Sequence, residues 1–203
     1  VFQNPDNQII GTSVEEDVAF GPENKNIEPE KIRKIVETVL RKVKLWDRRK
    51  ASPSILSGGQ KQRLATADAL AGLPACLVLD EPTAMLDPDS RKEVINIVKE
   101  LNRKEGMTII LITHHTDEVV DADRIVLMKD GKIIGDDIPK KIFADYELLK
   151  KAKMDIPPVV ELGMRLEKQQ IGLEGPVLQE QEMIEKIVKL YRSKCGGKKD
   201  AAR

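Results

Sequence analysis

The sequence predicts an α/β fold in which a parallel β-sheet is flanked by helices. Two short apolar runs, residues 76–80 and 108–113, are typical of buried parallel strands. Between them, residues 90–104 carry Val94, Ile97, Val98 and Leu101 at helical spacing. A strand, a helix and a second strand in this order indicate a parallel sheet with a covering helix.

Upstream of the first strand, helical patterns dominate and predict a helical subdomain over about residues 13–72. Ser13 is a candidate N-cap, with acidic residues in the turn that follows it. Pro29 stands where a first helical residue is favoured. A helix is also expected over about 60–73, ended by Pro74. The helix that begins at Pro29 carries an apolar stripe typical of core packing, namely Ile32, Ile35, Val36, Val39, Leu40 and Val43.

Downstream, Asp130-Gly131 lies between two β-rich runs and predicts a two-residue hairpin turn. The composition changes after Ile138, and helices are expected over 159–169 and 183–191, with a disordered tail at the end. These patterns predict two parts. Residues 1–137 form an α/β domain, and residues 138–203 form a small carboxyl-terminal helical region.

Composition narrows the class of protein. The 203 residues contain 34 Lys plus Arg and 34 Asp plus Glu, a balance that gives no broad basic surface for nucleic acid. No uncharged apolar run approaches the roughly 18 residues that a membrane span needs. Two cysteines imply no disulfide framework, so a cytosolic protein is expected.

The run Ser57-Gly58-Gly59-Gln60 stands just before an alanine-rich helix and has two interpretations. It is a flexible joint with Ser57 as the helix cap, the commoner meaning of such a run. Alternatively, the glycines let the backbone approach an anion, since N–H groups at a helix start point toward negative charge.

Three chemically active side chains follow the two predicted strands. Asp80 and Glu81 end the first strand and His114 follows the second, so all three are expected at one sheet edge, where ligands bind in such folds. Asp80 could hold Mg²⁺ through water, Glu81 could orient or deprotonate a water, and His114 could donate to a phosphoryl oxygen. Taken singly, Asp80 would more often cap a turn, and His114 would more often be a structural histidine.

The ordered set "LSGGQ", "LVLDEPTAMLD" and "LITHH" closely resembles the ATP-binding cassette ATPases, over residues 1–137. The resemblance implies a P-loop nucleoside-triphosphatase fold with a helical signature subdomain. It also implies that two cassettes meet head to tail and enclose two ATP molecules. Ser57, Gly58, Gly59 and Gln60 match the signature motif, which reaches the γ-phosphate held by the partner cassette.

Further roles follow from the same resemblance. Asp80 matches the Walker B acid that holds Mg²⁺, and Glu81 matches the catalytic glutamate. Asp87 matches the D-loop acid that bridges the dimer, and His114 matches the switch histidine. Gln3 matches the Q-loop glutamine, which contributes to the magnesium site and links it to a membrane partner. The implied cofactors are ATP and Mg²⁺.

One family motif is missing from the printed residues. No GxxxxGK[ST] loop, whose backbone N–H groups and lysine cradle phosphates, occurs in the chain. In the family it precedes the Q-loop glutamine, so the expectation is an amino-terminal truncation. The 203 residues alone are then expected to hydrolyse ATP only at a background rate.

The stretches "VFQNPDNQIIGTSVEEDVAFGPEN" and "KMDIPPVVELGMRL" resemble one subgroup, the energy-coupling factor (ECF) transporter ATPases, which includes the cobalt-import ATPases. This resemblance implies ATP-driven import of a vitamin or a transition-metal ion. The implied partners are a second cassette subunit, identical or different, a transmembrane coupling subunit and a substrate-binding membrane subunit. The protein would sit peripherally on the cytoplasmic face of the cell membrane.

Some alternatives remain open from the sequence. Glu15, Glu16 and Asp17 could seat a basic helix of the coupling subunit, or could be a solvated acidic helix start favoured by the helix dipole. Asp68 stands where a small residue or arginine is commoner, and neither it nor His115 has an assigned role. The alternative functions are a soluble cassette ATPase or regulator without a membrane partner, or an inactive fragment.

Overall fold

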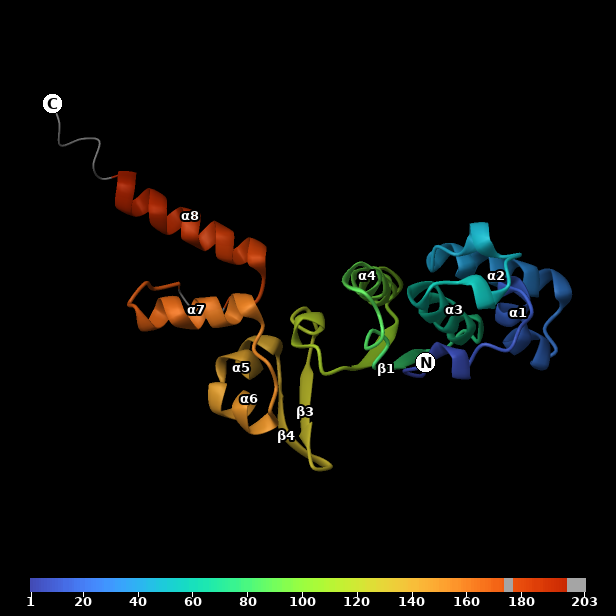
Figure 1. Cartoon of the computed structure of the whole chain (residues 1–203), viewed down its shortest axis with the longest axis horizontal. Coiled ribbons are helices and arrows are strands. Elements are labelled where there is room, and N and C mark those ends of the chain that lie inside the picture. The colour runs from blue at the N-terminus through green and yellow to red at the C-terminus, as the bar shows by residue number, and fades with distance from the viewer. Residues whose placement is uncertain (174–176, 197–203) are drawn as a thin grey trace. The chain divides into compact units, whose positions relative to one another are not determined.

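The structure, a computed structural model, describes residues 1–173 and 177–196 (Figure 1). The chain divides into two compact units, Val1–Thr113 and His114–Arg203, and each is described by itself. The division falls earlier than the predicted domain boundary at Asp137, so the 125–137 hairpin is grouped with the carboxyl-terminal helices. The two predicted domains themselves remain a prediction.

The first unit contains a helical part followed by a strand–helix–strand part. Short 3₁₀ helices η1 (Pro5–Asn7), η2 (Trp46–Arg48) and η3 (Pro53–Ile55) separate the longer elements. The helices are α1 (Val14–Asn24), α2 (Pro29–Lys42), α3 (Gly58–Ala71) and α4 (Pro88–Glu105). The strands are β1 (Cys76–Asp80) and β2 (Thr108–Ile112).

The predicted helix starts are confirmed. Ser13 caps α1 by accepting the backbone N–H of Glu16, and Pro29 is the first residue of α2. Helix α3 begins two residues before the predicted start, because Ser57 caps it and both glycines are already helical.

The two strands pair in parallel, with Cys76 opposite Thr108 and Asp80 opposite Ile112. The backbone of Val1 continues this pairing on the other side of β1, since its carbonyl oxygen accepts the Asp80 N–H at 3.0 Å. The carboxyl ends of both strands therefore reach the same sheet edge. This edge is where Asp80 and Glu81 leave β1.

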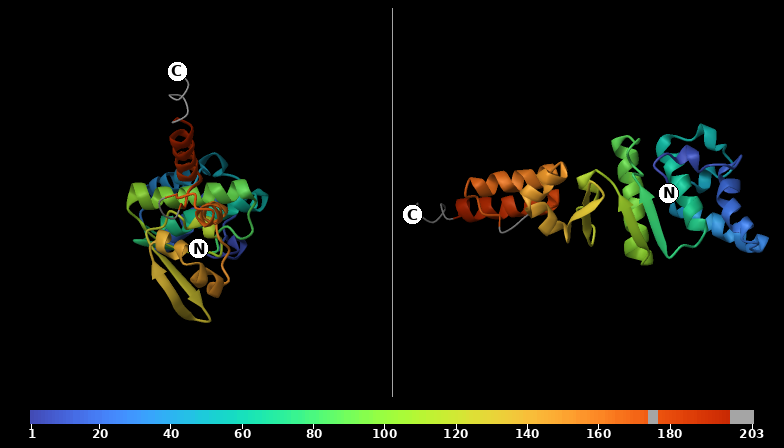
Figure 2. Two further views of the ribbon diagram at one scale, coloured as in Figure 1. Left: turned by 90° about the vertical axis from the view of Figure 1, so that its left-hand side faces the viewer. Right: turned by 90° about the horizontal axis from the view of Figure 1, so that it is seen from below.

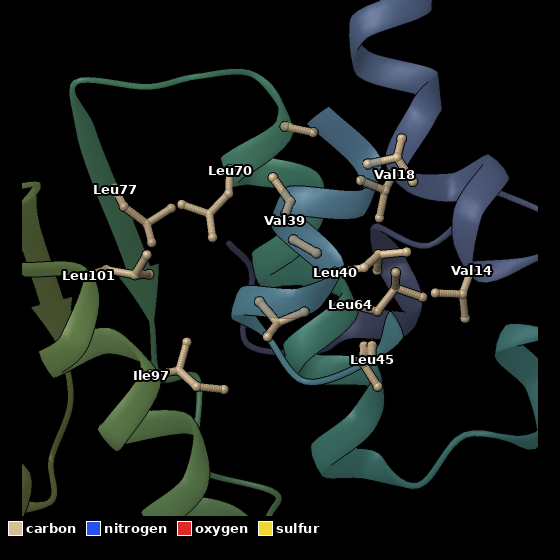
Figure 3. Packing of buried hydrophobic residues seen from close by; sticks show 14 of the residues in the cluster. Val14, Val18, Val39, Leu40, Leu45, Leu64, Leu70, Leu77, Ile97 and Leu101 are labelled. Atoms are coloured by element: carbon tan, nitrogen blue, oxygen red, sulfur yellow. The ribbon is translucent and has the colours of Figure 1, made fainter. Parts of the chain in front are cut away.

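A hydrophobic core joins the helices of the first unit to one face of the strands. Leu40 of α2, Leu64 of α3 and Leu45 in the connection between these helices are each almost fully buried. Leu77 of β1 points toward Leu70 of α3, which links the sheet to the helical part (Figure 3). The apolar stripe predicted for α2 packs into this core.

The opposite sheet face differs from the expectation of fully buried strands. Leu77 and Leu79 are buried, but Val78, Ile110 and Ile112 are 45 %, 50 % and 48 % exposed. Side chains alternate between the two faces of a strand, so burying one face leaves every second residue open. An apolar run does not reveal how many of its faces are covered.

The second unit begins with η4 (Thr116–Glu118) and the antiparallel hairpin of β3 (Ile125–Lys129) and β4 (Lys132–Asp137). Asp130 and Gly131 both have positive φ, 49° and 73°, which confirms the predicted two-residue turn. Helices α5 (Pro139–Ala144) and α6 (Tyr146–Ala152) pack on the hairpin around Phe143 and Leu149.

Helices α7 (Pro158–Lys168) and α8 (Glu180–Gly196) follow and lie side by side (Figure 2). Both coincide closely with the predicted helices, although α8 extends beyond 183–191 in each direction. Residues 197–203, for which a disordered tail is predicted, lie outside the described residues. Within the described ranges, the structure contains no helix with the length and apolar character needed to cross a membrane.

Candidate nucleotide site

The start of α3 is held by reciprocal side-chain and backbone hydrogen bonds. Ser57 Oγ accepts the Gln60 N–H at 3.3 Å, and Gln60 Oε1 accepts the Ser57 N–H at 3.0 Å. This capping box fixes the first turn of the helix. The Gln60 side chain, predicted to contact the nucleotide, therefore has a structural role within this chain, and its predicted contact remains untested.

The two glycines of this turn have different surroundings. Gly59 is buried, and a Cβ atom placed on it would lie 2.7 Å from Ser90 Cβ and Oγ on α4. Gly58 is exposed, and a Cβ there would lie 3.5 Å from Leu86 Cδ2, an ordinary contact. Close helix packing therefore explains Gly59, whereas no packing constraint of this kind explains Gly58.

Gln3 and Glu81 are joined directly, although the whole helical part and β1 separate them in sequence. Gln3 Nε2 donates to Glu81 Oε2 at 2.7 Å. A hydrogen bond to a charged carboxylate is stronger than one between neutral groups. Two residues that are predicted for the same nucleotide site with different roles are thus in contact, and the glutamine orients the carboxylate.

The backbone at Glu81 is unusual and positions the side chain. Glu81 has φ of +44°, in the left-handed region that a residue other than glycine rarely adopts. Its N–H donates to the Ile112 carbonyl at 2.8 Å, which ties the turn to the end of β2. Such strain costs about 1–3 kcal/mol and tends to occur at functional sites.

Asp80 ends β1 at the same sheet edge, with its residue exposed. Its carboxylate and the amide oxygen of Gln3 are hard oxygen ligands of the kind that Mg²⁺ prefers. Since Gln3 uses its Nε2 for Glu81, its Oε1 remains the atom suited to a cation. The chemistry of these two side chains thus fits a magnesium ion.

Asp87 caps the next helix. It accepts the backbone N–H groups of Asp89 and Ser90 at 3.1 and 3.0 Å. A hydrogen bond from the Ser90 side chain, together with these backbone donors, lowers the pKa of Asp87. The structure gives this residue an N-cap role in its own chain, and its predicted part in bridging a dimer stays a prediction.

A small pocket of about 150 Å³ opens between the segment after Gln3, the first turns of α3 and the loop around Met85. Lys61 on its wall pairs with Asp6 at 2.7 Å, which ties that segment to α3. This pair is not among the residues predicted from the sequence. The sequence signal that could have indicated Lys61 is its place directly after the signature motif.

His114 belongs to the second unit, two residues beyond the end of β2. It is exposed, and its ring centroid lies 4.2 Å from that of His115 at an interplanar angle of 37°. The first unit brings Gln3 and Glu81 together and forms the capped start of α3. The predicted action of His114 on a phosphate stays a prediction.

Comparison with known proteins identifies the family of this chain. The sequence model described as "ABC transporter" matches residues 1–84. The chain is 55 % identical over 187 residues to the energy-coupling factor transporter ATP-binding protein EcfA1 of Caldanaerobacter subterraneus subsp. tengcongensis, covering 92 % of this chain and 68 % of the relative. It is 50 % identical over 190 residues to the protein of that name from Clostridium novyi, with coverage of 94 % and 68 %.

Two solved structures of ATP-binding cassette proteins are also similar to this chain. CbiO1 from Clostridium perfringens, part of the ABC transporter complex cbiONQ, matches with a TM-score of 0.69 at 38 % identity, covering 82 % of this chain and 66 % of that one. The ATP-binding cassette MJ0796, a dimer bound to ADP and Pi, matches with a TM-score of 0.59 at 30 % identity, covering 68 % and 61 %. The chain thus spans about two thirds of the length of these relatives. It belongs to the ATP-binding cassette ATPases, in the group of the energy-coupling factor transporter ATP-binding proteins.

Proposed function

We propose that this protein is the ATP-hydrolysing subunit of an ECF-type importer, works as a head-to-tail cassette dimer, and powers uptake of a vitamin or a transition-metal ion. The observation that carries the proposal is the 2.7 Å hydrogen bond between Gln3 and Glu81, at the edge where β1 ends. The names of the relatives support the transport role, since they are ATP-binding proteins of such transporters.

In this proposal each residue has a defined task. Glu81, oriented by Gln3, positions the attacking water and accepts its proton. Asp80, through water, and the Gln3 amide oxygen would hold Mg²⁺, which would neutralise charge on the phosphates. The His114 imidazole donates to a γ-phosphate oxygen.

The start of α3 serves the ATP of the opposite cassette. The Ser57 hydroxyl and the N–H groups at the helix N-terminus suit an anion, because the helix dipole favours negative charge there. Gly58 is exposed, so a phosphate can approach the backbone closely at this point. Ser57, Gly58 and Gly59 thus act on the γ-phosphate held by the partner.

Replacing Glu81 by glutamine tests the catalytic role. The substitution Glu81→Gln keeps the shape of the side chain and an acceptor for Gln3, but removes the base. We expect ATP turnover by the full-length protein in its transporter to fall by about 10²–10⁴-fold, with ATP binding retained. Glu100→Gln, an exposed change on α4, is the matched control and should leave turnover unchanged. Normal turnover by Glu81→Gln would contradict the proposal.

The acidic start of α1 is the proposed seat of the coupling subunit. Glu15 is 4.0 Å from Arg49 and Glu16 accepts the Thr12 hydroxyl, and that hydrogen bond lowers the pKa of Glu16. Both side chains are accessible to a basic helix. Asp17 is only 4 % exposed, so its expected place in this seat is wrong: its carboxylate points into the fold.

Charge reversal tests this docking surface. We expect Glu15→Lys with Glu16→Lys to weaken assembly with the transmembrane coupling subunit, measured by co-purification from membranes at low salt. Glu28→Lys with Glu37→Lys, at the N-cap of α2 and within α2, is the control of equal charge change. Unchanged assembly of the first variant would leave Glu15 and Glu16 as a solvated helix start stabilised by the dipole.

A further inference from the structure

Helices α1 and α3 pack against each other, and Asp17 of α1 and Asp68 of α3 interact across this packing. Asp17 Oδ1 accepts the N–H groups of Ile10 and Gly11 at 2.8 and 2.6 Å. Asp17 Oδ2 and both carboxyl oxygens of Asp68 are buried, without a hydrogen-bond partner within 3.5 Å. Three buried acceptor atoms without a donor would be costly if both side chains were carboxylates.

A single proton removes this difficulty. When Asp68 is a carboxylic acid, its hydroxyl donates to Asp17, and the two groups no longer repel each other. Burial raises the pKa of Asp68 to about 9, and the negative charge of Asp17 and the hydrogen bond between the two groups act in the same direction. The Gln8 amide acts in the opposite direction.

The pair also holds a segment of chain. Residues 8–11 connect the Gln3 region to α1, and Gln8 Nε2 donates to the Ala65 carbonyl of α3 at 2.7 Å. At Gly11 the chain passes so close to α1 that a Cβ would lie 2.5 Å from the Asp17 nitrogen. The segment is thus tied to α3 directly by Gln8 and to α1 by Asp17.

We propose that Asp68 is a neutral carboxylic acid that donates a hydrogen bond to Asp17, and that this shared proton locks the 8–11 segment onto the signature helix α3. Asp68 is then a positioning residue that acts through Asp17. Its effect on turnover rests on the proposed function, because the 8–11 segment follows Gln3 in the chain and α3 begins directly after Ser57. The presence of the proton does not rest on it.

The sign of the pH dependence follows from the raised pKa. Asp68 titrates near 4 in an unfolded chain and near 9 in the folded one, so the folded state holds one more proton between these values. Stability from this group is complete at the acidic end and declines as the pH rises toward 9. The two basic residues of α3, Lys61 and Arg63, pair with Asp6 and Glu93.

Infrared difference spectroscopy of the full-length protein tests the proton directly. We expect the carbonyl stretch of a protonated carboxylic acid at pH 7 in the wild type and its loss in Asp68→Asn. Asp47→Asn, an exposed change of equal charge, should retain the signal. An absent signal in the wild type, or one that persists in Asp68→Asn, would overturn the proposal even if the protein hydrolyses ATP normally.

Stability and exchange measurements test the lock. The side-chain amide introduced by Asp68→Asn can still donate to Asp17, so this variant should fold and lose the pH dependence. Relative to this variant, the folding constant of the wild type should fall by up to about tenfold per pH unit between pH 5 and 8. Exchange at the Ile10 and Gly11 amides should rise with pH in the wild type beyond its intrinsic increase, and less in the variant. Parallel pH profiles would overturn the lock.

Discussion

At the scale of single residues, the glycines at the start of α3 separate packing from chemistry. The buried Gly59 lies against Ser90 of α4, and the exposed Gly58 has only an ordinary contact with Leu86. Helix packing thus requires a glycine at position 59 but not at the neighbouring position 58. The sequence offers two explanations for the pair, a joint or an anion site, and the structure supplies a third for Gly59.

Alanine at each position tests this division. Gly59→Ala should destabilise the protein by about 1–3 kcal/mol, because the added methyl overlaps the short Ser90 side chain and the two helices must move apart. Gly58→Ala should change stability by no more than about 0.5 kcal/mol and should lower only ATP turnover in the assembled transporter. Denaturant unfolding of the full-length variants measures the first effect.

A double variant provides the control for this prediction. Ser90→Gly removes the side chain that the new methyl would meet, so Gly59→Ala combined with Ser90→Gly should be less destabilised than the sum of the single changes. Strict additivity, or a Gly59→Ala protein as stable as the wild type, would show that close packing is not the reason for this glycine.

At the scale of elements, caps and turn residues made the first unit largely predictable. Strand β1 has the predicted ends, and Ser13 and Pro29 mark the starts of α1 and α2 as expected. These elements depend on local chemistry that adjacent residues carry. The start of α3 was misplaced by two residues, because the capping box at Ser57 takes glycines into the helix that propensity alone would exclude.

What could not be predicted depends on contacts between distant elements. The half-exposed face of β1 and β2 is set by what covers the sheet, and an apolar run carries no such information. The contact between Gln3 and Glu81 was expected only as a shared site, and its hydrogen bond needed the folded chain. The Asp17–Asp68 pair had no local signal except that Asp68 stands in an alanine-rich helix.

At the scale of the whole molecule, each unit has a hydrophobic core of its own. The first core includes Leu64 from α3, and the second includes Leu149 from α6, each almost fully buried. The two clusters share no buried member among the described residues. A compact unit with its own core can unfold separately from its neighbour when a substitution destabilises it.

Truncating one leucine in each core tests this independence. Leu64→Ala and Leu149→Ala should each destabilise their own unit by about 2–5 kcal/mol, from lost burial and the cavity left behind. Hydrogen exchange should then rise within residues 1–113 for the first variant and within 114–173 for the second. The double variant should show the sum of the two patterns. Exchange that rises across both units after one change, or clear non-additivity, would show that the two cores unfold as one cooperative structure.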